Sequence, residues 1–88
     1  MQIELKGSMM TDRDALHDYL QAQLGLPSHY GRNLDALYDL LTERSEPTEI
    51  VVTEWELPEC NVGGYGADLM EALYDAAKEN PKLTVRVR

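Results

Sequence analysis

Two stretches near the ends of the chain alternate between apolar and polar residues. The odd positions are apolar over residues 1–6 and again over residues 83–88, up to Val87. A period of two is typical of a β-strand with one buried face. Residues 50–53 read Ile-Val-Val-Thr without alternation. Such a run predicts a central strand of a parallel sheet, buried on both faces, and Trp55 is expected to anchor its end.

Three segments between these strands carry apolar residues at helical spacing. They are residues 12–24, 34–43 and 67–80. Thr11, with Asp14 three positions later, matches a capping box at the start of the first segment. Asn33 is a favourable N-cap for the second segment, Gly25 ends the first, and Pro81 stops the third.

Each pair of successive strands is separated by a helix, so the sheet is predicted to be parallel with right-handed crossovers. The continuously apolar strand belongs in the middle, which gives the order 1-2-3. Residues 57–66 contain one proline and three glycines, and they predict a loop or a short fourth helix. The expected fold class is therefore α/β: one two-layer domain over residues 1–88, with three to four helices mainly on one face of the sheet.

The second helix carries an unusual polar face. Its core stripe consists of leucines at positions 34, 37 and 41. Asp35, Asp39 and Thr42 lie on the opposite side, and Tyr38 lies at the boundary. Two carboxylates at i, i+4 destabilise a helix by roughly 0.2–0.5 kcal/mol. Carboxylates beside tyrosines resemble the anchors of a protein interface, but the plainer interpretation is a solvated face with tyrosines packed at the rim of the core.

The charge balance favours a basic partner. The chain has 8 Lys and Arg against 16 Asp and Glu, a net charge of −8. That charge repels nucleic acid and anionic membranes and attracts basic proteins, although it could also serve solubility alone. The single cysteine, Cys60, excludes an intrachain disulfide, and the first residues lack the apolar run of a signal peptide. We therefore expect a cytoplasmic protein.

Residues 29–41 read His-Tyr-Gly-Arg-Asn-Leu-Asp-Ala-Leu-Tyr-Asp-Leu-Leu. This segment resembles the central motif of the barstar family, roughly Y-G-x-N-x-D-A-L-x-D-x-L, with fixed spacing over consecutive residues. The predicted order of strands and helices also agrees with that family, as does the strand ending in Glu54-Trp55. The resemblance implies an inhibitor, not an enzyme, that is monomeric when free. Such an inhibitor needs no metal or cofactor and binds a basic, barnase-like extracellular ribonuclease 1:1.

The resemblance also implies roles for individual residues. Asp39 would occupy the phosphate subsite of the nuclease, facing its arginines and catalytic histidine, and Asp35 would pair with a basic group at the rim of the cleft. Tyr30 would pack on the catalytic histidine, and His29 would contribute at the edge. The full predicted partner-binding set is His29, Tyr30, Gly31, Asn33, Asp35, Tyr38, Asp39, Thr42 and Asp75.

The chain departs from the best-known member of that family at several positions. Tyr38 stands in place of tryptophan, and residues 43–44 (Glu-Arg) replace a Gly-Trp pair. Arg32 replaces an acid and would face a basic enzyme unfavourably unless it turns away. Ala76 stands where that member has a carboxylate, and Asp75 is adjacent, pointing about 100° away on the helix. These departures leave the identity of the target nuclease open.

Other functions remain as alternatives. The same acidic face could serve a non-inhibitory adaptor that binds another basic protein. An outward pair of aspartates lacks the pocket that would separate their pKa values for acid–base catalysis. Residues 63–66 (Gly-Gly-Tyr-Gly) precede a helix but lack the Lys-Ser/Thr of a phosphate-binding loop. His17 and His29 are isolated in the sequence and are expected to be packing or surface residues, and Cys60 is expected to be an inert thiol.

Overall fold

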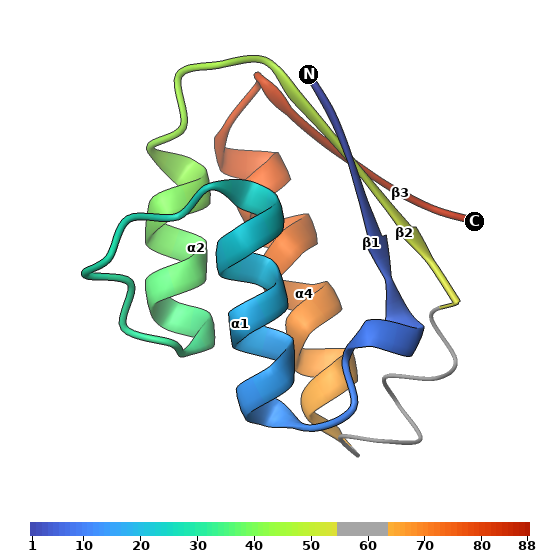
Figure 1. Ribbon diagram of the computed structural model, residues 1–88. Coiled ribbons are helices and arrows are strands. Elements are labelled where there is room, and N and C mark those ends of the chain that lie inside the picture. Colours follow the sequence, from blue (N-terminus) through green and yellow to red (C-terminus); the bar gives the residue numbers. More distant parts are fainter. Residues whose placement is uncertain (55–63) are drawn as a thin grey trace.

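The computed structural model describes residues 1–54 and 64–88. Along the chain, the elements are β1 (Gln2–Lys6), a 3₁₀ turn η1 (Gly7–Met9), α1 (Arg13–Leu24), α2 (Leu34–Thr42), β2 (Thr48–Thr53), α4 (Gly64–Glu79) and β3 (Leu83–Val87). The helices form one layer and the sheet the other (Figure 1). The expectations for Trp55, Cys60 and residues 57–63 lie outside the described part of the chain.

The three strands form a parallel sheet in the order β1-β2-β3, which confirms the predicted topology. Ile50 of β2 lies between Ile3 of β1 and Val85 of β3. Strand β2 begins at Thr48, two residues before the expected start, because the Thr48 N–H donates to the carbonyl of Lys82 (2.8 Å) and extends the ladder. Residues 50–52 are buried, as expected for a central strand.

The core lies between the sheet and the three helices. Its fully buried side chains are mostly leucines from every helix: Leu16, Leu20, Leu24, Leu37, Leu41, Leu69 and Leu73. The opposite face of the sheet has the buried Val51 at its centre and polar side chains around it, with Glu49 accepting from Gln2 (2.9 Å) and from Arg86 (3.2 Å). The helices therefore cover one face of the sheet, in agreement with the predicted two-layer architecture.

Helix α1 is capped by a different residue from the one predicted. Asp12, not Thr11, is the N-cap: its backbone is extended and its Oδ1 accepts from the N–H of Ala15 (2.8 Å). Both residue types cap helices well, and the chain places the carboxylate where it reaches the free N–H groups. At the other end Gly25 adopts the left-handed conformation (φ 64°), and its N–H donates to the carbonyl of Gln21, which confirms the predicted stop.

Helix α4 starts earlier than its sequence suggests. The segment Gly64–Gly66, expected to belong to a loop or a short separate helix, forms the first turn of α4. Glycine weakens a helix by up to about 1 kcal/mol relative to alanine, but Tyr65 packs against the core and its hydroxyl hydrogen-bonds to Nε2 of His17 (2.6 Å). Tertiary contacts of this kind outweigh the unfavourable local propensity.

The C-terminal end of α2 is fixed by two polar side chains from other segments. Asn80, which is buried, donates through Nδ2 to the carbonyls of Leu41 and Arg44 (both 2.9 Å). Arg44 in turn donates to the carbonyl of Leu24 at the end of α1 (2.9 Å) and to Oγ1 of Thr48 (2.8 Å). Helix α2 is thus tied to α1, α4 and β2 at this end, and its orientation is set by the fold.

Candidate functional site

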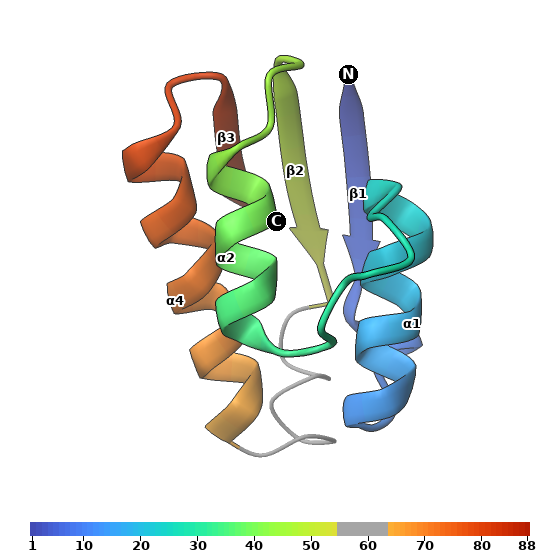
Figure 2. The ribbon, with the colours of Figure 1, turned by 90° about the vertical axis from the view of Figure 1, so that its left-hand side faces the viewer.

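Helix α2 presents its polar face to solvent. Figure 2 shows α2 between α1 and α4, in front of the sheet, with the segment from α1 crossing to its N-terminal end. Leu37 and Leu41 point into the core and are 0% exposed, whereas Asp35 and Asp39 are exposed. Asn33 caps the helix, accepting the Ala36 N–H on its Oδ1 (2.8 Å), as predicted. The predicted division of the helix into a leucine face and an acidic face is confirmed.

Asp39 is the carboxylate in the middle of this face. Over residues 1–54 and 64–88, no lysine, arginine or histidine lies within ion-pair distance of it. The hydroxyl of Thr42 donates to the backbone carbonyl of Asp39 (2.9 Å) and not to its side chain. The carboxylate of Asp39 is therefore free to meet another molecule. Thr42 is half-buried and its proton is bound within the helix, so it can offer a partner only the lone pairs of its oxygen.

Carboxylates from α4 extend the acidic face. Helices α2 and α4 pack side by side (Figure 2). Tyr38 of α2 is half-buried. Partial burial, followed by the negative charges of Glu79, Asp75 and Asp39, raises the pKa of Tyr38 above its usual value. Asp75 is paired only loosely with Lys78 (4.0 Å), and its side chain is 49% exposed. The structure therefore brings Asp75 close enough to Tyr38 for its charge to act on the hydroxyl, although the two residues are distant in the sequence.

Glu79 was absent from the set predicted from the sequence. It lies on α4 four residues after Asp75, and its charge acts on the Tyr38 hydroxyl. The i, i+4 spacing of two acids on one helix was a usable signal. Nothing local in the sequence, however, indicated that this part of α4 packs beside α2.

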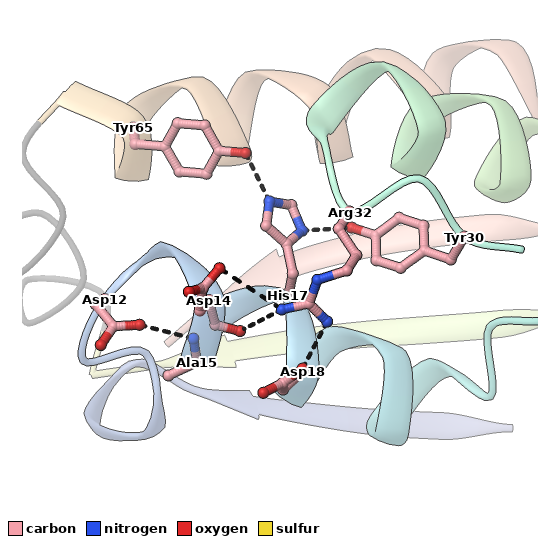
Figure 3. Close-up of polar contacts among 8 residues, drawn as sticks. All are labelled: Asp12, Asp14, Ala15, His17, Asp18, Tyr30, Arg32 and Tyr65. Carbon is pink, nitrogen blue, oxygen red and sulfur yellow. Dashed lines mark hydrogen bonds and ion pairs between the residues drawn. The ribbon is translucent and has the colours of Figure 1, made fainter. Parts of the chain in front are cut away.

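Tyr30 is placed differently from its predicted role. Its side chain is 5% exposed, and its hydroxyl hydrogen-bonds to Nδ1 of His17 (2.6 Å), as Figure 3 shows. Burial, followed by the neighbouring Tyr65, raises the pKa of Tyr30 to about 12, so the hydroxyl stays protonated. The ring is part of the core and is not presented to solvent. Contact between Tyr30 and a partner's histidine, expected from the sequence, is therefore not available in this arrangement.

His17 is not the isolated residue that the sequence suggested. It is 4% exposed, and its two ring nitrogens hydrogen-bond to the hydroxyls of Tyr30 and Tyr65 (2.6 Å each). Desolvation, followed by the positive charge of Arg32, lowers the pKa of His17 below 6.5. The guanidinium of Arg13 lies over the ring of Tyr65, 4.2 Å from its centroid. His17 thus packs in the core, one of the two roles expected for it, and joins α1 to the segment before α2 and to α4.

In the segment before α2, the residue with the unfavourable backbone conformation is Arg32, the neighbour of Gly31. Gly31 does not have a positive φ; Arg32 does, at 56°. A Cβ at Gly31 would lie 3.2 Å from Nδ2 of Asn33 and 3.3 Å from Cβ of Ala36, so this position needs a small residue for space. Asn33 also donates to the carbonyl of Gly31 (3.2 Å), and His29 is exposed. The segment is therefore compact and folded back on itself.

Arg32 turns away from the acidic face. Its guanidinium donates to Asp18 (2.5 Å) and to the carbonyl of Asp14 (3.0 Å), both on α1 (Figure 3). Arg32 was expected to repel a basic partner unless its side chain pointed away from the acidic face, and here the side chain does point away. Arg44, the other arginine near α2, is bound to the ends of α1 and β2, so neither cation neutralises Asp39.

Two other kinds of feature, a metal-binding cluster and a membrane-spanning helix, are absent from the described residues. Within residues 1–54 and 64–88, no three His, Cys, Asp or Glu side chains converge as a metal ion would require. In the same ranges, no helix has the length and apolar character needed to cross a bilayer. The chemistry of this surface is that of exposed carboxylates with aromatic and hydroxyl neighbours, which suits recognition of a cationic protein surface.

Comparison with known proteins assigns the chain to a family. Residues 1–88 match the family model described as Barstar (barnase inhibitor). The chain is also 35% identical over 79 residues to a protein of Bacillus subtilis (strain 168) named "Putative ribonuclease inhibitor YrdF", a match that covers 89% of this chain and 87% of that protein. The chain therefore belongs to the barstar family, a family of ribonuclease inhibitors.

Proposed function

We propose that this protein inhibits a basic, barnase-like ribonuclease by placing the acidic face of α2 in its active site, with Asp39 in the position of an RNA phosphate. The observation that carries the proposal is the state of Asp39. It is exposed in the middle of a helix whose opposite side is locked in the core, and no cation in the described part of the chain pairs with it.

A free carboxylate on a fixed helix suits this role for a physical reason. Two carboxylate oxygens can accept a pair of parallel hydrogen bonds from arginine, as a phosphate does. A carboxylate already paired within its own chain would have to lose that partner on binding, whereas Asp39 has only its water shell to lose. The rigid helix also holds the charge in place before the partner arrives, which reduces the entropy lost on binding.

Neighbouring residues divide into contact residues and supporting residues. We assign the contacts to six members of the predicted set whose side chains are exposed or half-exposed and are not used to shape the segment before α2: His29, Asp35, Tyr38, Asp39, Thr42 and Asp75. Gly31 and Asn33 shape the segment, because the amide of Asn33 is already bound to Gly31 and Ala36. Tyr30 supports the segment from within the core. The inhibitor acts in the cytoplasm as a monomer that binds its target 1:1.

Titration of the protein into a barnase activity assay tests the proposal. The parent should abolish RNA cleavage near one equivalent, and Asp39→Asn should raise the inhibition constant by about 30-fold or more, as expected for a residue at the centre of an interface. Glu46→Gln is the matched control: it removes one exposed negative charge beyond the end of α2 and should change inhibition by less than about three-fold.

Two outcomes would contradict the proposal. Equal, small losses for Asp39→Asn, Glu46→Gln and Glu71→Gln would indicate diffuse charge attraction in place of a phosphate mimic. Capture of a basic protein from the source organism without loss of RNase activity would instead support the adaptor alternative. An RNase assay of the captured material separates these cases, and it also identifies a target other than barnase.

A further inference from the structure

The segment that joins α1 to α2 contains a residue in an unfavourable backbone conformation. Arg32 has φ 56°, in the left-handed region that residues with a Cβ rarely adopt. It directly precedes Asn33, the N-cap of α2. The conformation of Arg32 therefore sets the direction in which the chain enters the helix that carries Asp35 and Asp39, and contacts elsewhere must hold it there.

Within residues 1–54 and 64–88, the polar partners of the Arg32 side chain lie on α1. Nη1 of Arg32 donates to Oδ1 of Asp18 (2.5 Å), and Nη2 donates to the carbonyl of Asp14 (3.0 Å) and lies 3.8 Å from its carboxylate (Figure 3). Two residues earlier, Tyr30 is bound to His17, the neighbour of Asp18 on α1. The Tyr30–His17 contact is buried, and the Arg32–Asp18 contact lies at the surface. Together they attach Tyr30 and Arg32 to the same helix.

We propose that Arg32 is a positioning residue for the inhibitory contact, acting through Asp18. The Arg32–Asp18 pair holds the entry to α2 so that its acidic face is already arranged in the free protein. This inference rests on the proposed function. When only a fraction of molecules has the binding-competent arrangement, the apparent dissociation constant rises in inverse proportion to that fraction. Releasing Arg32 from Asp18 lowers the fraction.

The sign of the effect separates positioning from simple electrostatics. Arg32 is a positive charge close to a surface that meets a basic enzyme. If only its charge mattered, Arg32→Ala would tighten binding. If Arg32 positions the segment, the same substitution weakens binding despite the more favourable charge. The side chains of Arg32 and Asp18 are 37% and 71% exposed, so we expect a moderate effect, about 3- to 10-fold.

The experiment compares Arg32→Ala, Asp18→Asn and the double variant for inhibition of barnase. Each single variant should weaken inhibition by about 3- to 10-fold, and the double variant should match Arg32→Ala, because both changes remove the same interaction. The exchanged pair Arg32→Asp with Asp18→Arg should recover part of the loss. Arg86→Ala is the matched control: it removes an arginine paired with Glu49 on the polar face of the sheet, and it should leave inhibition within about two-fold.

Hydrogen exchange in the free protein gives a readout that needs no partner. The N–H of Tyr30 donates to the carbonyl of Pro27 (3.0 Å) within the segment. In Arg32→Ala this amide should exchange about 3- to 10-fold faster, while the amide of Leu73 in α4 keeps its protection. Unchanged exchange at Tyr30, or inhibition by Arg32→Ala as tight as the parent's, would overturn the inference. Unaltered inhibition by Asp39→Asn would instead overturn the proposed function.

Discussion

Asn80 joins the end of α4 to the end of α2, and its replacement tests whether this joint stabilises the fold. The side chain is 5% exposed and makes three hydrogen bonds. Nδ2 donates to the carbonyls of Leu41 and Arg44 (both 2.9 Å), and Oδ1 accepts from the N–H of Lys82 (3.0 Å). Asn80→Ala removes all three bonds and leaves two carbonyls and one N–H without these partners.

The expected cost follows from those three groups. A hydrogen bond contributes about 1 kcal/mol net, and a buried polar group left without a partner costs about 1–3 kcal/mol. The bond to Leu41 is buried and the other two are partly exposed, so their unpaired groups can recruit water. We therefore expect Asn80→Ala to lower the free energy of unfolding by about 2–4 kcal/mol, a large part of the roughly 5–15 kcal/mol typical of a domain.

Asn80→Asp separates hydrogen bonding from side-chain size. Aspartate keeps the oxygen that accepts from Lys82, but at neutral pH it places a second oxygen, with no proton, against the carbonyls of Leu41 and Arg44. It should destabilise at least as much as alanine, despite its nearly identical shape. Asn33→Asp is the comparison: aspartate keeps the oxygen that caps α2 and loses only the exposed hydrogen bond from Nδ2 to the carbonyl of Gly31, so it should cost less than about 1 kcal/mol.

Urea unfolding followed by far-UV circular dichroism measures these differences. The midpoint should fall for Asn80→Ala and Asn80→Asp, with the dependence on urea unchanged. If Asn80→Asp unfolded within about 0.5 kcal/mol of the parent, the two donated hydrogen bonds would contribute nothing. The tie between α4 and α2 would then have to come from apolar packing alone.

Three further predictions concern charge, pH and capping. Association with barnase should slow steeply with added salt while dissociation changes little, and salt-independent association in stopped-flow measurements would contradict steering by the acidic surface. Because burial lowers the pKa of His17 in the folded state, the unfolded chain binds a proton first as the pH falls below 6.5. Stability should therefore decrease from pH 6.5 downward by at most about 1.4 kcal/mol per unit, and a His17→Gln variant should lack this component in urea titrations. In thermal unfolding, Asp12→Ala should lower the free energy of unfolding by about 1 kcal/mol and Thr11→Ala by less than about 0.5 kcal/mol. The reverse order would indicate that Thr11 is the N-cap.

The sheet and its topology were predictable because the apolar and polar residues of each strand show which of its faces are buried. Alternation placed β1 and β3 at the edges, and the unbroken run around Ile50 placed β2 at the centre. Element ends were less certain. Thr11 and Asp12 are both good caps, and only the three-dimensional arrangement shows which side chain reaches the free N–H groups. The start of α4 at Gly64 depends on contacts with α1, which no local pattern contains.

The same division applies to the candidate site. The exposure of Asp39 follows from the leucine stripe on the other side of its helix, so sequence periodicity alone places it. The burial of Tyr30 could not be predicted from periodicity, because its partner His17 lies on α1. A tyrosine in a polar, glycine-containing segment reads as a surface residue until that contact is known. The roles of Arg32 and Glu79 were likewise hidden from the sequence. Arg32 contacts Asp18 on α1, and Glu79 acts on Tyr38 from α4, so both roles depend on how the helices pack.

The acidic face of α2 is available because the fold engages the nearby cations elsewhere. Arg32 is bound to α1, Arg44 to the end of α1 and to Thr48, and Lys78 lies beside Asp75 on α4. The like-charge pair on α2 costs only about 0.2–0.5 kcal/mol. Burial of one leucine such as Leu37 contributes about 1.5–3 kcal/mol and offsets this several times over. A stable helix can therefore keep Asp39 unpaired, and a substitution that gave Asp39 a lysine on its own helix should stabilise the chain while weakening the inhibition that we propose.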